Sequence, residues 1–443
     1  MEQLTGKSVL VIGWGVTGRA LAAFLAPRAA RVTVAEQRMD ADHAGLPAGA
    51  ILRVGREELA WLEGIDLVVP SPGVPRVNPL LRAASERGVP VIGEIELAAQ
   101  MGAPVTVAVT GTNGKSTVTT MLAAIFAADG RKTFVGGNLG TPLITAVGQD
   151  YDSSVVEVSS FQLEWTQTLR PRVGVYLNLS EDHLDRYRDL AEYGSFKARL
   201  FQFQHAEDWA VLNRDDPRVW ALAHRVRARV VSFGLGAPAE GTAAVWPQEG
   251  ALRYALEGRH GVIPWDRRRL PGRHNLANAL AAVAAALAAG IEPDAIARGL
   301  AGFKGLAHRV ELVHEKNGVR FVDDSKGTNV GAVLEALEAV EPPIILLAGG
   351  VDKGGDYGPL RAPLQARVKA LIVFGAAREA MDAALSGATR IEVRSNLEQA
   401  LQCAWSLAER GDTILLSPAC SSFDQFSNYA ERGRRFKELA RAL

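Results

Sequence analysis

The stretch 105–122 constrains the fold and the chemistry of this chain more than any other. An apolar run at 105–110 stops at the turn Gly111-Thr112-Asn113-Gly114-Lys115-Ser116-Thr117, and a stretch with helical character follows. This order predicts a buried strand, a loop whose backbone N–H groups surround phosphate, and a helix whose N-terminus faces the anion. The pattern therefore predicts an ATP site.

The side chains at the end of this loop fit the same interpretation. Lys115 is placed to reach the outer phosphates, and the hydroxyl of Ser116 or Thr117 can ligate Mg²⁺. A strict phosphate-loop pattern has glycine at position 109, where this chain has Val109, so the loop is a variant. The alternative is an ordinary glycine-rich turn with one exposed lysine. That alternative leaves the paired hydroxyls and the preceding apolar run unexplained.

A second glycine pattern lies near the N-terminus. An apolar run at 8–12 is followed by Gly13, Gly15 and Gly18, a helical stretch, a second apolar run and the acidic Glu36. This order is typical of dinucleotide-binding folds, so we expect a phosphorylated ligand at the helix N-terminus. A nicotinamide-dependent dehydrogenase is one hypothesis, but nothing downstream resembles a hydride-transfer site.

Short apolar runs alternate with helical patterns along most of the chain, which predicts an α/β fold with mainly parallel sheets. The 443 residues are too many for a single core. We expect three domains, at 1–98, 99–303 and 304–443: a Rossmann-like domain, a central domain resembling phosphate-loop ATPases, and a second Rossmann-like domain. A strand is expected at 90–93, and a weak β meander without chemistry at 235–268.

Charge and cysteine content exclude several classes of function. The 49 Lys and Arg residues balance 49 Asp and Glu residues, so no net field favours nucleic acid or an anionic membrane. Small molecules are therefore the expected partners. Two cysteines make neither a disulfide framework nor a metal site. The first residues lack the basic and apolar regions of a signal peptide, and we expect a cytoplasmic protein.

Polar residues follow several of the expected strands. Glu157 and His183 end apolar runs and should lie at the same sheet edge as Lys115, where a carboxylate and an imidazole near a triphosphate indicate divalent metal ligation. Alternatively, Glu157 is a hydrogen-bonded carboxylate of the core or the sheet edge, and His183 caps a helix. Three further polar clusters, at 324–329, 351–356 and 419–426, follow strands of the C-terminal third and indicate a ligand site there. Asn275 and Asn278 share a helical face and could read a base edge, although Asn275 could equally be a cap.

These residues resemble the Mur ligase family along essentially the whole chain. Besides the phosphate loop, the resemblance rests on Gly136-Gly137-Asn138-Leu139-Gly140, residues 157–164 and 181–187, Arg273-His274-Asn275, His308-Arg309, and residues 324–329 and 416–422. The phosphate loop and the Glu157 and His183 clusters are shared across the family, including the folylpolyglutamate synthetases. The clusters at 324–329 and 416–422 point to the branch that adds D-glutamate.

The resemblance implies an ATP-dependent acid–amino-acid ligase of peptidoglycan precursor synthesis. It implies a first domain that holds the uridine diphosphate of UDP-N-acetylmuramoyl-L-alanine, a central ATPase domain, and a C-terminal domain that brings in D-glutamate. The reaction would proceed through an acyl phosphate, and the protein would be a monomer. Another amino-acid-adding Mur-type or folylpolyglutamate-type ligase is the nearest alternative. An ATP-driven switch without ligase activity would leave the C-terminal clusters without a purpose.

The resemblance also implies residue roles at the ATP site. It assigns ATP to Gly111, Thr112, Asn113, Gly114, Lys115, Ser116 and Thr117, and, across a cleft, to Asn275, Asn278, Arg309, Asp324 and Lys326. It assigns two Mg²⁺ sites to Ser116, Glu157, His183 and Lys197, with Lys197 carbamylated by CO₂. Lys115, Glu157, His183 and Lys197 are the implied catalytic residues. For Lys197 the alternative is a solvated lysine paired with Glu192 or another surface carboxylate.

The implied substrate contacts fall into three groups. The uridine diphosphate would meet Gly15, Val16, Thr17, Glu36, Gln37, Arg38, Ser71 and Gly73. The reacting carboxylate would meet Asn138 and Ser159, and D-glutamate would meet Thr328, Lys353 and Ser422. The family usually has aspartate and threonine where this chain has Glu36 and Gln37, so the uracil contacts are left open. Tyr429 stands where the family often has phenylalanine, and it should still pack and could add a hydrogen bond.

Overall fold

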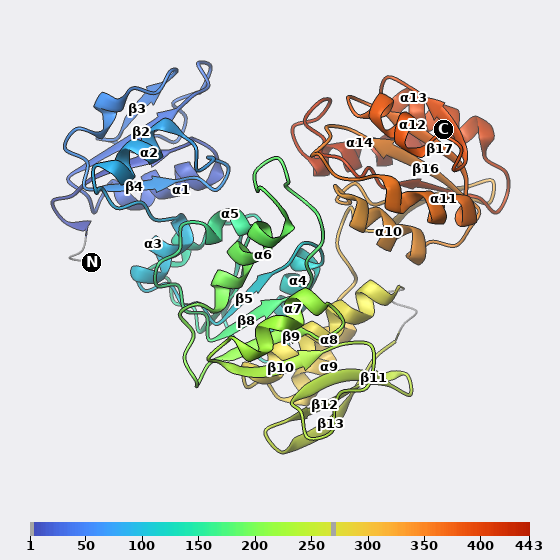
Figure 1. Ribbon diagram of the computed structural model, residues 1–443, viewed down its shortest axis with the longest axis horizontal. Helices are drawn as coiled ribbons and strands as arrows, with labels where there is room; N and C mark the ends of the chain where they lie inside the picture. Colours follow the sequence, from blue (N-terminus) through green and yellow to red (C-terminus); the bar gives the residue numbers. More distant parts are fainter. Residues whose placement is uncertain (1–3, 267–271) are drawn as a thin grey trace. The chain divides into compact units, whose positions relative to one another are not determined.

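The computed structural model describes residues 4–266 and 272–443. These residues form two compact units. The first contains the chain up to Asn178 together with Gly194–Trp265 and Ala279–Gly302, and the second contains Leu179–Tyr193, Asp266–Asn278 and Phe303–Leu443. Two sheets lie in the first unit and one in the second, so the predicted α/β fold with mainly parallel sheets is confirmed (Figure 1).

The first sheet has four parallel strands in the order β3-β2-β1-β4. Its strands are β1 (Ser8–Ile12), β2 (Arg31–Glu36), β3 (Ile51–Val54) and β4 (Leu67–Pro70), and its helices are α1 (Val16–Leu25), η2 (Leu59–Leu62) and α2 (Pro79–Glu86). Leu80 and Leu81 of α2 join a buried cluster with Leu10 and Ile12 of β1. Apolar strands and one apolar helix face therefore make this core.

The strand expected at 90–93 is wrong. Val91 forms only an isolated bridge with Val68. The segment ends at once because Gly93 is the N-cap of α3 (Glu94–Gln100), and Pro90 has no N–H to donate to a ladder.

The second sheet has nine strands in the order β13-β12-β11-β10-β9-β8-β5-β7-β6. They are β5 (Val107–Thr110), β6 (Thr133–Gly137), β7 (Ser153–Glu157), β8 (Val173–Tyr176), β9 (Trp209–Asn213), β10 (Arg229–Phe233), β11 (Ala244–Gln248), β12 (Ala251–Leu256) and β13 (Arg259–Pro264). Pairing is parallel from β6 to β11, and β11–β13 form the antiparallel meander predicted within 235–268.

Helices connect most of these parallel strands: α4 (Lys115–Ala128), η3 (Leu143–Ala146), α5 (Ser160–Leu163), α6 (Leu190–Ala198), η4 (Arg199–Phe201), α7 (Pro217–Trp220) and η5 (Ala221–His224). Two further helices, α8 (Arg273–Ala288) and α9 (Pro293–Gly302), follow β13. β5 lies between β7 and β8, and all three strands are buried throughout. Because β7 and β8 both run parallel to β5, the carboxyl ends of the three strands lie at the same edge of the sheet. Open α/β sheets bind ligands at this edge, where the strand order reverses.

The third sheet has the order β14-β15-β19-β16-β17-β18, and only β14 is antiparallel to its neighbour. Its strands are β14 (Glu311–Lys316), β15 (Val319–Asp323), β16 (Ile344–Gly349), β17 (Val368–Phe374), β18 (Arg390–Val393) and β19 (Thr413–Leu416). Its helices are α10 (Val330–Ala339), η6 (Gly358–Leu360), α11 (Arg361–Arg367), α12 (Arg378–Leu385), α13 (Leu397–Leu407) and α14 (Tyr429–Ala442).

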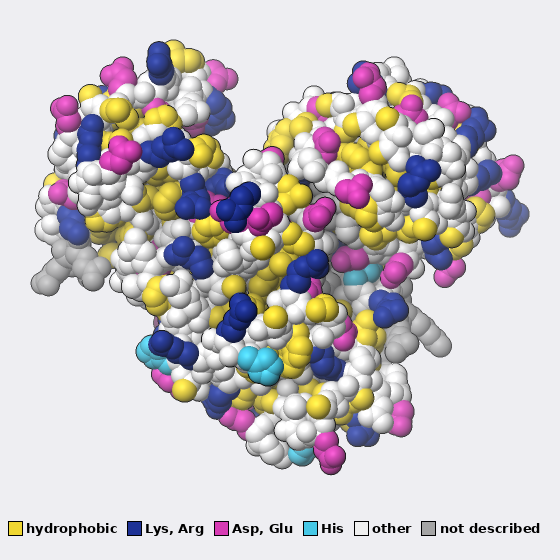
Figure 2. Space-filling view, viewed as in Figure 1, with side chains coloured by type: hydrophobic (Ala, Val, Ile, Leu, Met, Phe, Trp, Pro, Cys, Tyr) yellow, Lys and Arg dark blue, Asp and Glu magenta, His cyan; other side chains and the backbone are white. Residues whose placement is uncertain are grey.

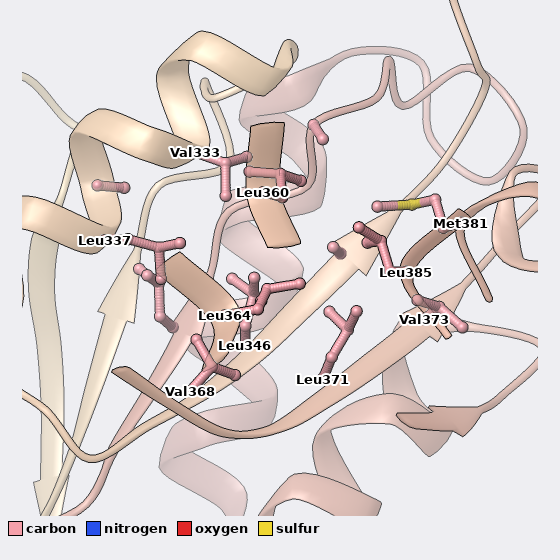
Figure 3. Packing of buried hydrophobic residues seen from close by; sticks show 14 of the residues in the cluster. Val333, Leu337, Leu346, Leu360, Leu364, Val368, Leu371, Val373, Met381 and Leu385 are labelled. Carbon is pink, nitrogen blue, oxygen red and sulfur yellow. The ribbon is translucent and has the colours of Figure 1, made fainter. Parts of the chain in front are cut away.

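Helices cover both faces of the third sheet. Leu346 of β16 packs with residues of α10, α11 and α12, such as Leu337 and Leu364 (Figure 3). The next residue, Leu347, packs with residues of α13 and α14, such as Phe436, on the opposite face. This alternation is the period of a strand, and the burial of both faces explains the continuous apolar run of β16.

The surface agrees with the balanced composition. On the face shown in Figure 2, basic and acidic side chains are interspersed rather than gathered by sign. Among the helices of the described residues, none is both long and apolar enough to cross a membrane.

Candidate active site

The phosphate loop joins β5 to α4. Gly114 is the N-cap of α4 with φ of 81°, and Gly111 has φ of 150°, a conformation that favours glycine. A Cβ on Gly111 would also lie 2.9 Å from the Cβ of Leu177. The Lys115 Nζ donates to the carbonyls of Gly111 and Thr112, at 2.7 Å each. The lysine is therefore folded back over the loop whose amides would hold phosphate.

Glu157, the last residue of β7, connects this loop to the segment after β6. Its Oε2 accepts a hydrogen bond from the Ser116 Oγ at 2.6 Å, and its Oε1 accepts one from the Asn138 Nδ2 at 2.7 Å. Only 3% of Glu157 is exposed. A buried carboxylate beside a hydroxyl at the mouth of a phosphate loop is a donor set of hard oxygens, and this fits Mg²⁺.

Lys197 lies near the end of α6 and is buried, with 1% of the residue exposed. Its Nζ donates to the carbonyl of Gly111 at 2.8 Å. The alternative of a solvated lysine is therefore wrong, because a surface lysine would keep its ammonium in water. The structure brings Lys197 to the same loop carbonyl that Lys115 contacts.

Asn178 is a residue of this site that the sequence analysis did not single out. It follows β8, and its Oδ1 accepts from the Asn113 N–H at 2.8 Å while its Nδ2 donates to the Asn113 carbonyl at 3.2 Å. Its own carbonyl accepts from the Thr112 N–H. Asn178 thus fixes the middle of the phosphate loop. The available signal was its position at the end of an apolar strand.

Ser159 caps α5 in this structure. Its Oγ accepts from the Gln162 N–H at 3.3 Å, and the Gln162 side chain accepts from the Ser159 N–H, which completes a capping box. The predicted substrate role of Ser159 stays a prediction.

His183 belongs to the second unit, in the segment Leu179–Tyr193. Its backbone has a positive φ of 57°, and its Nε2 lies 3.6 Å from the Asp182 Oδ2. The ring also lies edge-on to Tyr193. These contacts orient the imidazole, and its predicted metal role remains a prediction.

The N-terminal glycine pattern forms a close contact between α1 and the loop before it. A Cβ on Gly18 would lie 1.9 Å from the Gly13 carbonyl oxygen, so only glycine fits there. Gly15, Val16 and Thr17 form the N-terminus of α1. The Ser71 Oγ donates to the Gly13 carbonyl at 3.4 Å. Glu36, Gln37 and Gly73, three of the residues predicted to contact the uridine diphosphate, line a pocket of about 170 Å³. The other lining residues are Ile12, Gly13, Ala35, Glu57, Val74, Pro75 and Asn78.

Glu36 at the end of β2 is occupied by protein donors. Its Oε2 accepts from the Trp14 N–H at 2.8 Å, and its Oε1 accepts from the backbone and side chain of Arg38 at 3.0 and 3.1 Å. Burial acts to raise the pKa of Glu36, but the hydrogen bonds from Arg38 and Trp14 outweigh it and lower the pKa. The carboxylate therefore braces the glycine loop, which is a role that the sequence did not reveal.

Two pairs of predicted residues meet at the carboxyl edge of the third sheet. The Lys353 Nζ donates to the Thr328 Oγ1 at 3.3 Å, and the Lys326 Nζ donates to the Tyr429 Oη at 3.1 Å. The Lys326 Nζ also lies 4.7 Å from the centroid of the Tyr429 ring. Tyr429 therefore packs as expected and accepts the additional hydrogen bond. Ser422, which is buried, follows the same strand as Cys420 and Ser417.

Two of the residues predicted to meet the nucleotide from the second unit, Asp324 and Asn278, are buried. Asp324 accepts from the Ser417 Oγ at 2.7 Å, and burial raises its pKa to about 7. Arg309 pairs with Glu335 at 3.0 Å. Asn275 and Asn278 lie near the start of α8, and Asn278 is 6% exposed.

His274 lies in the Arg273-His274-Asn275 pattern and has no predicted role. Both of its ring nitrogens are buried and have no hydrogen-bond partner among the described residues. Burial, with a contribution from Arg309, lowers its pKa to about 4. The ring is therefore a neutral imidazole at physiological pH.

Arg432 of α14 is a second residue that the sequence analysis missed. It is fully buried, and its guanidinium donates to the Ser325 Oγ at 3.0 Å and to the carbonyls of Ser325, Gly349, Cys420 and Ser421. These acceptors lie after β15, at the end of β16 and after β19. One side chain therefore ties together the three loops predicted to bind ligands. Its sequence neighbours in a charged amphipathic helix gave no signal.

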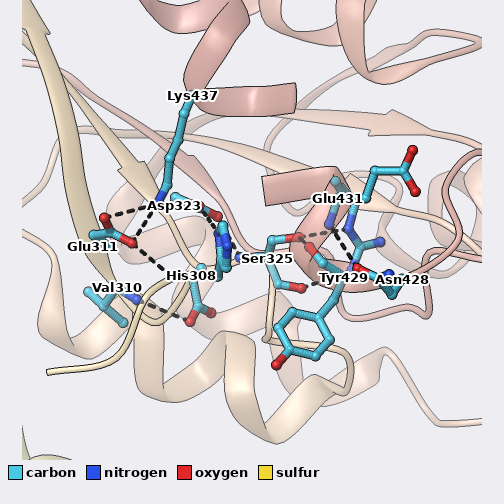
Figure 4. Close-up of polar contacts among 11 residues, drawn as sticks. His308, Val310, Glu311, Asp323, Ser325, Asn428, Tyr429, Glu431 and Lys437 are labelled. Atoms are coloured by element: carbon cyan, nitrogen blue, oxygen red, sulfur yellow. Dashed lines mark hydrogen bonds and ion pairs between the residues drawn. The ribbon is translucent and has the colours of Figure 1, made fainter. Parts of the chain in front are cut away.

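His308, Glu311 and Asp323 form a cluster with metal-ligand chemistry, but a lysine already occupies it (Figure 4). The His308 Nδ1 lies 2.6 Å from the Asp323 Oδ2, and the Lys437 Nζ donates to both oxygens of Glu311, at 2.9 and 2.8 Å. The Lys437 ammonium is also 3.8 Å from Asp323. This cluster is an internal ion-pair network that joins α14 to the sheet.

Comparison with known proteins covers all of this architecture. A model described as the MurD-like N-terminal domain of Mur ligases matches residues 7–93, the Mur ligase middle domain matches 109–286, and the Mur ligase glutamate ligase domain matches 308–420. The UDP-N-acetylmuramoylalanine–D-glutamate ligase of Geobacter metallireducens is 45% identical over 448 residues, which cover 100% of this chain and 98% of the relative. The chain belongs to the Mur ligase family.

Other comparisons agree with this assignment. The ligase of the same name from Geotalea uraniireducens is 46% identical to this Mur ligase, over 100% of the chain and 98% of the relative. Among solved structures, a pseudomurein peptide ligase type C from Methanothermus fervidus has a TM-score of 0.60 at 22% identity, covering 93% of this chain and 96% of that one. The MurF ligase of Thermotoga maritima in complex with ADP has a TM-score of 0.59 at 18% identity, covering 100% and 96%. These two structures establish the shared fold.

Proposed function

We propose that this Mur ligase joins D-glutamate to UDP-N-acetylmuramoyl-L-alanine at the expense of ATP, in peptidoglycan precursor synthesis. The observation that carries the proposal is its 45% identity, along the full length of the chain, to a ligase named for this reaction. The phosphate loop with Lys115, Ser116 and Glu157 supplies the matching chemistry in the first unit.

The proposed reaction activates a carboxylate, which is by itself a poor acyl donor. The γ-phosphoryl group of ATP passes to a carboxylate oxygen of the alanyl substrate, and ADP leaves. The free amine of D-glutamate then attacks the acyl carbon, and phosphate leaves with the former carboxylate oxygen. Lys115 and the loop amides stabilise the charge on the transferring phosphoryl group. Asn138, held by Glu157, and Ser159 are proposed to contact the reacting carboxylate.

Magnesium fits the donor set of the first unit. The Ser116 hydroxyl and the Glu157 carboxylate offer oxygens 2.6 Å apart, and we assign one ion to them. When bound, Mg²⁺ neutralises phosphate charge and polarises the transferred group. From the resemblance, we propose that His183 and Lys197, the latter as a carbamate, are metal ligands as well.

Carbamylation of Lys197 is compatible with its hydrogen bond. A lysine carbamate keeps one N–H on Nζ, so donation to the Gly111 carbonyl, now at 2.8 Å, can persist. We expect protein incubated with ¹³C-bicarbonate to give a carbamate ¹³C signal that is absent in Lys197→Ala. Lys132→Ala, which removes a lysine whose side chain is 60% exposed, should keep it. A signal that survives in Lys197→Ala would assign the carbamate elsewhere.

The remaining contacts are proposed from the resemblance, together with the pocket and the hydrogen bonds described above. The uridine diphosphate is assigned to the pocket with Glu36, Gln37 and Gly73, and D-glutamate to Thr328, Lys353 and Ser422. The nucleotide base, ribose and phosphates are assigned to Asn275, Asn278, Arg309, Asp324 and Lys326. Domain boundaries at 98 and 303, a monomeric state and a cytoplasmic location stay predictions.

Phosphate release from ATP tests the proposal directly. We expect release only when UDP-N-acetylmuramoyl-L-alanine and D-glutamate are both present. Release without either substrate would support an ATP-driven switch. Absence of release, together with a change in NAD(P)-linked absorbance, would support the dehydrogenase that the first glycine pattern suggested.

A further inference from the structure

An ion pair in the second unit joins Asp182 to Lys353. The Asp182 Oδ1 lies 3.3 Å from the Lys353 Nζ, and the Asn329 Nδ2 donates to the Asp182 Oδ2 at 3.2 Å. The Asp182 side chain is 7% exposed and the Lys353 side chain is 19% exposed. Asp182 precedes His183, whose ring it contacts, and it has no role toward a substrate in the proposed reaction.

The pair lines a pocket of about 200 Å³ within the second unit. Thr328, which shares Lys353 with Asp182, lines it as well. Much of the rest is apolar, since the lining includes Leu184, Val330, Leu334, Tyr357 and Pro359. Charges in such surroundings interact more strongly than in water, so each must find an opposite charge when a ligand enters.

We propose that the Asp182–Lys353 ion pair occupies the binding site of the amino-acid substrate. When the substrate binds, Asp182 and Lys353 separate and each pairs with a group of the substrate. Asp182 accepts the α-ammonium group of the incoming amino acid, while Lys353 and Thr328 take a carboxylate. The inference rests on the proposed function, which assigns D-glutamate to Lys353 and Thr328. Asp182 is then a binding residue that selects for an amino group.

Charge and geometry favour exchange over a permanent ion pair. The Lys353 Nζ lies 3.3 Å from the Asp182 Oδ1, which is longer than the 2.7–2.9 Å of a well-formed charge-assisted hydrogen bond. A ligand can therefore separate the two side chains. After exchange each of the two protein charges again faces one opposite charge. A dicarboxylate without an amino group would instead put its negative charge beside the Asp182 carboxylate after that carboxylate has lost the Lys353 ammonium.

The test compares D-glutamate with glutarate, the same carbon chain without the amino group. The substitution is Asp182→Asn, and the measurements are KM for D-glutamate and Ki for glutarate as its competitor in the phosphate-release assay. We expect KM for D-glutamate to rise about tenfold or more, as for loss of one charge-assisted hydrogen bond, and Ki for glutarate to fall. KM for ATP should change far less than KM for D-glutamate.

Control variants separate this role from general damage. Asp185→Asn, at an exposed position in the same segment, should change neither constant. Lys353→Ala should weaken both ligands, because both carry the carboxylate that Lys353 would bind.

The opposite outcomes overturn the inference. If Asp182→Asn tightens both ligands alike, Asp182 only competes for Lys353, and if it weakens both alike, the pocket is merely disturbed. Unchanged constants would make the ion pair irrelevant to the substrate. Wild-type protein that shows no response to D-glutamate would instead refute the proposed function, and this inference with it.

Discussion

Lys115 and Glu157 organise the first unit at the scale of single side chains. Lys115 is folded onto the carbonyls of Gly111 and Thr112, and Glu157 joins Ser116 of α4 to Asn138 after β6. Each group is held by hydrogen bonds before any ligand arrives. Such preorganisation is what makes a charged group effective on a transition state.

Lys115→Ala should therefore lower kcat by about a hundredfold or more, the effect of losing one preorganised electrostatic donor. Folding should persist, because the Gly111 carbonyl keeps its hydrogen bond from Lys197 when Lys115 is removed. The measurement is steady-state phosphate release together with a thermal melt. Lys132→Ala is the matched control and should keep normal turnover. Near-normal turnover in Lys115→Ala would remove this lysine from the mechanism.

The short helix α3 stabilises neighbouring loops through two buried carboxylates. Its Glu96 is fully buried and accepts hydrogen bonds from the N–H groups of Gln167, Thr168 and Leu169, the Thr168 hydroxyl and the Gln100 side chain. The carboxylate thus stabilises the loop that follows α5. Glu94, two residues earlier, accepts from the Ile144 N–H at 2.6 Å.

Glu96→Ala should lower the free energy of unfolding by about 3 kcal/mol or more, because buried backbone donors lose their acceptor. Chemical denaturation of the variant measures this. Glu86→Ala, on the exposed face of α2, should change stability little. Equal stability of the two variants would show that water replaces the Glu96 carboxylate.

Glu94 predicts a pH dependence of stability. Burial raises its pKa to about 7, although hydrogen bonds from Ile144 and Leu143 oppose the shift. The folded protein then holds this proton more tightly than the unfolded chain, so stability falls as pH rises from the ordinary glutamate range towards 7. Glu94→Gln should flatten that fall in a plot of Tm against pH. It should not abolish it, because the pKa of Asp324 is also raised to about 7. Parallel profiles would contradict the assignment.

At the scale of the whole molecule, local patterns predicted the sheets and the strand ends well. Lys115, Ser116 and Glu157 could be placed together because a phosphate loop and the end of a parallel strand occupy defined positions. The strand at 90–93 failed because a few apolar residues do not determine whether a ladder forms or a helix begins. Arg432 and Asn178 were missed because their roles depend on backbone carbonyls and amides far away in the sequence, which carry no signature in residue type.

The route of one oxygen atom tests the central claim, that this Mur ligase activates a carboxylate by phosphorylation before the amine attacks. UDP-N-acetylmuramoyl-L-alanine labelled with ¹⁸O in its alanyl carboxylate is turned over with ATP and D-glutamate, and the released phosphate is analysed by ³¹P NMR. We expect each phosphate to carry one ¹⁸O atom, because the carboxylate oxygen leaves with the phosphoryl group. Phosphate without ¹⁸O, formed at the same rate as the ligated product, would contradict it.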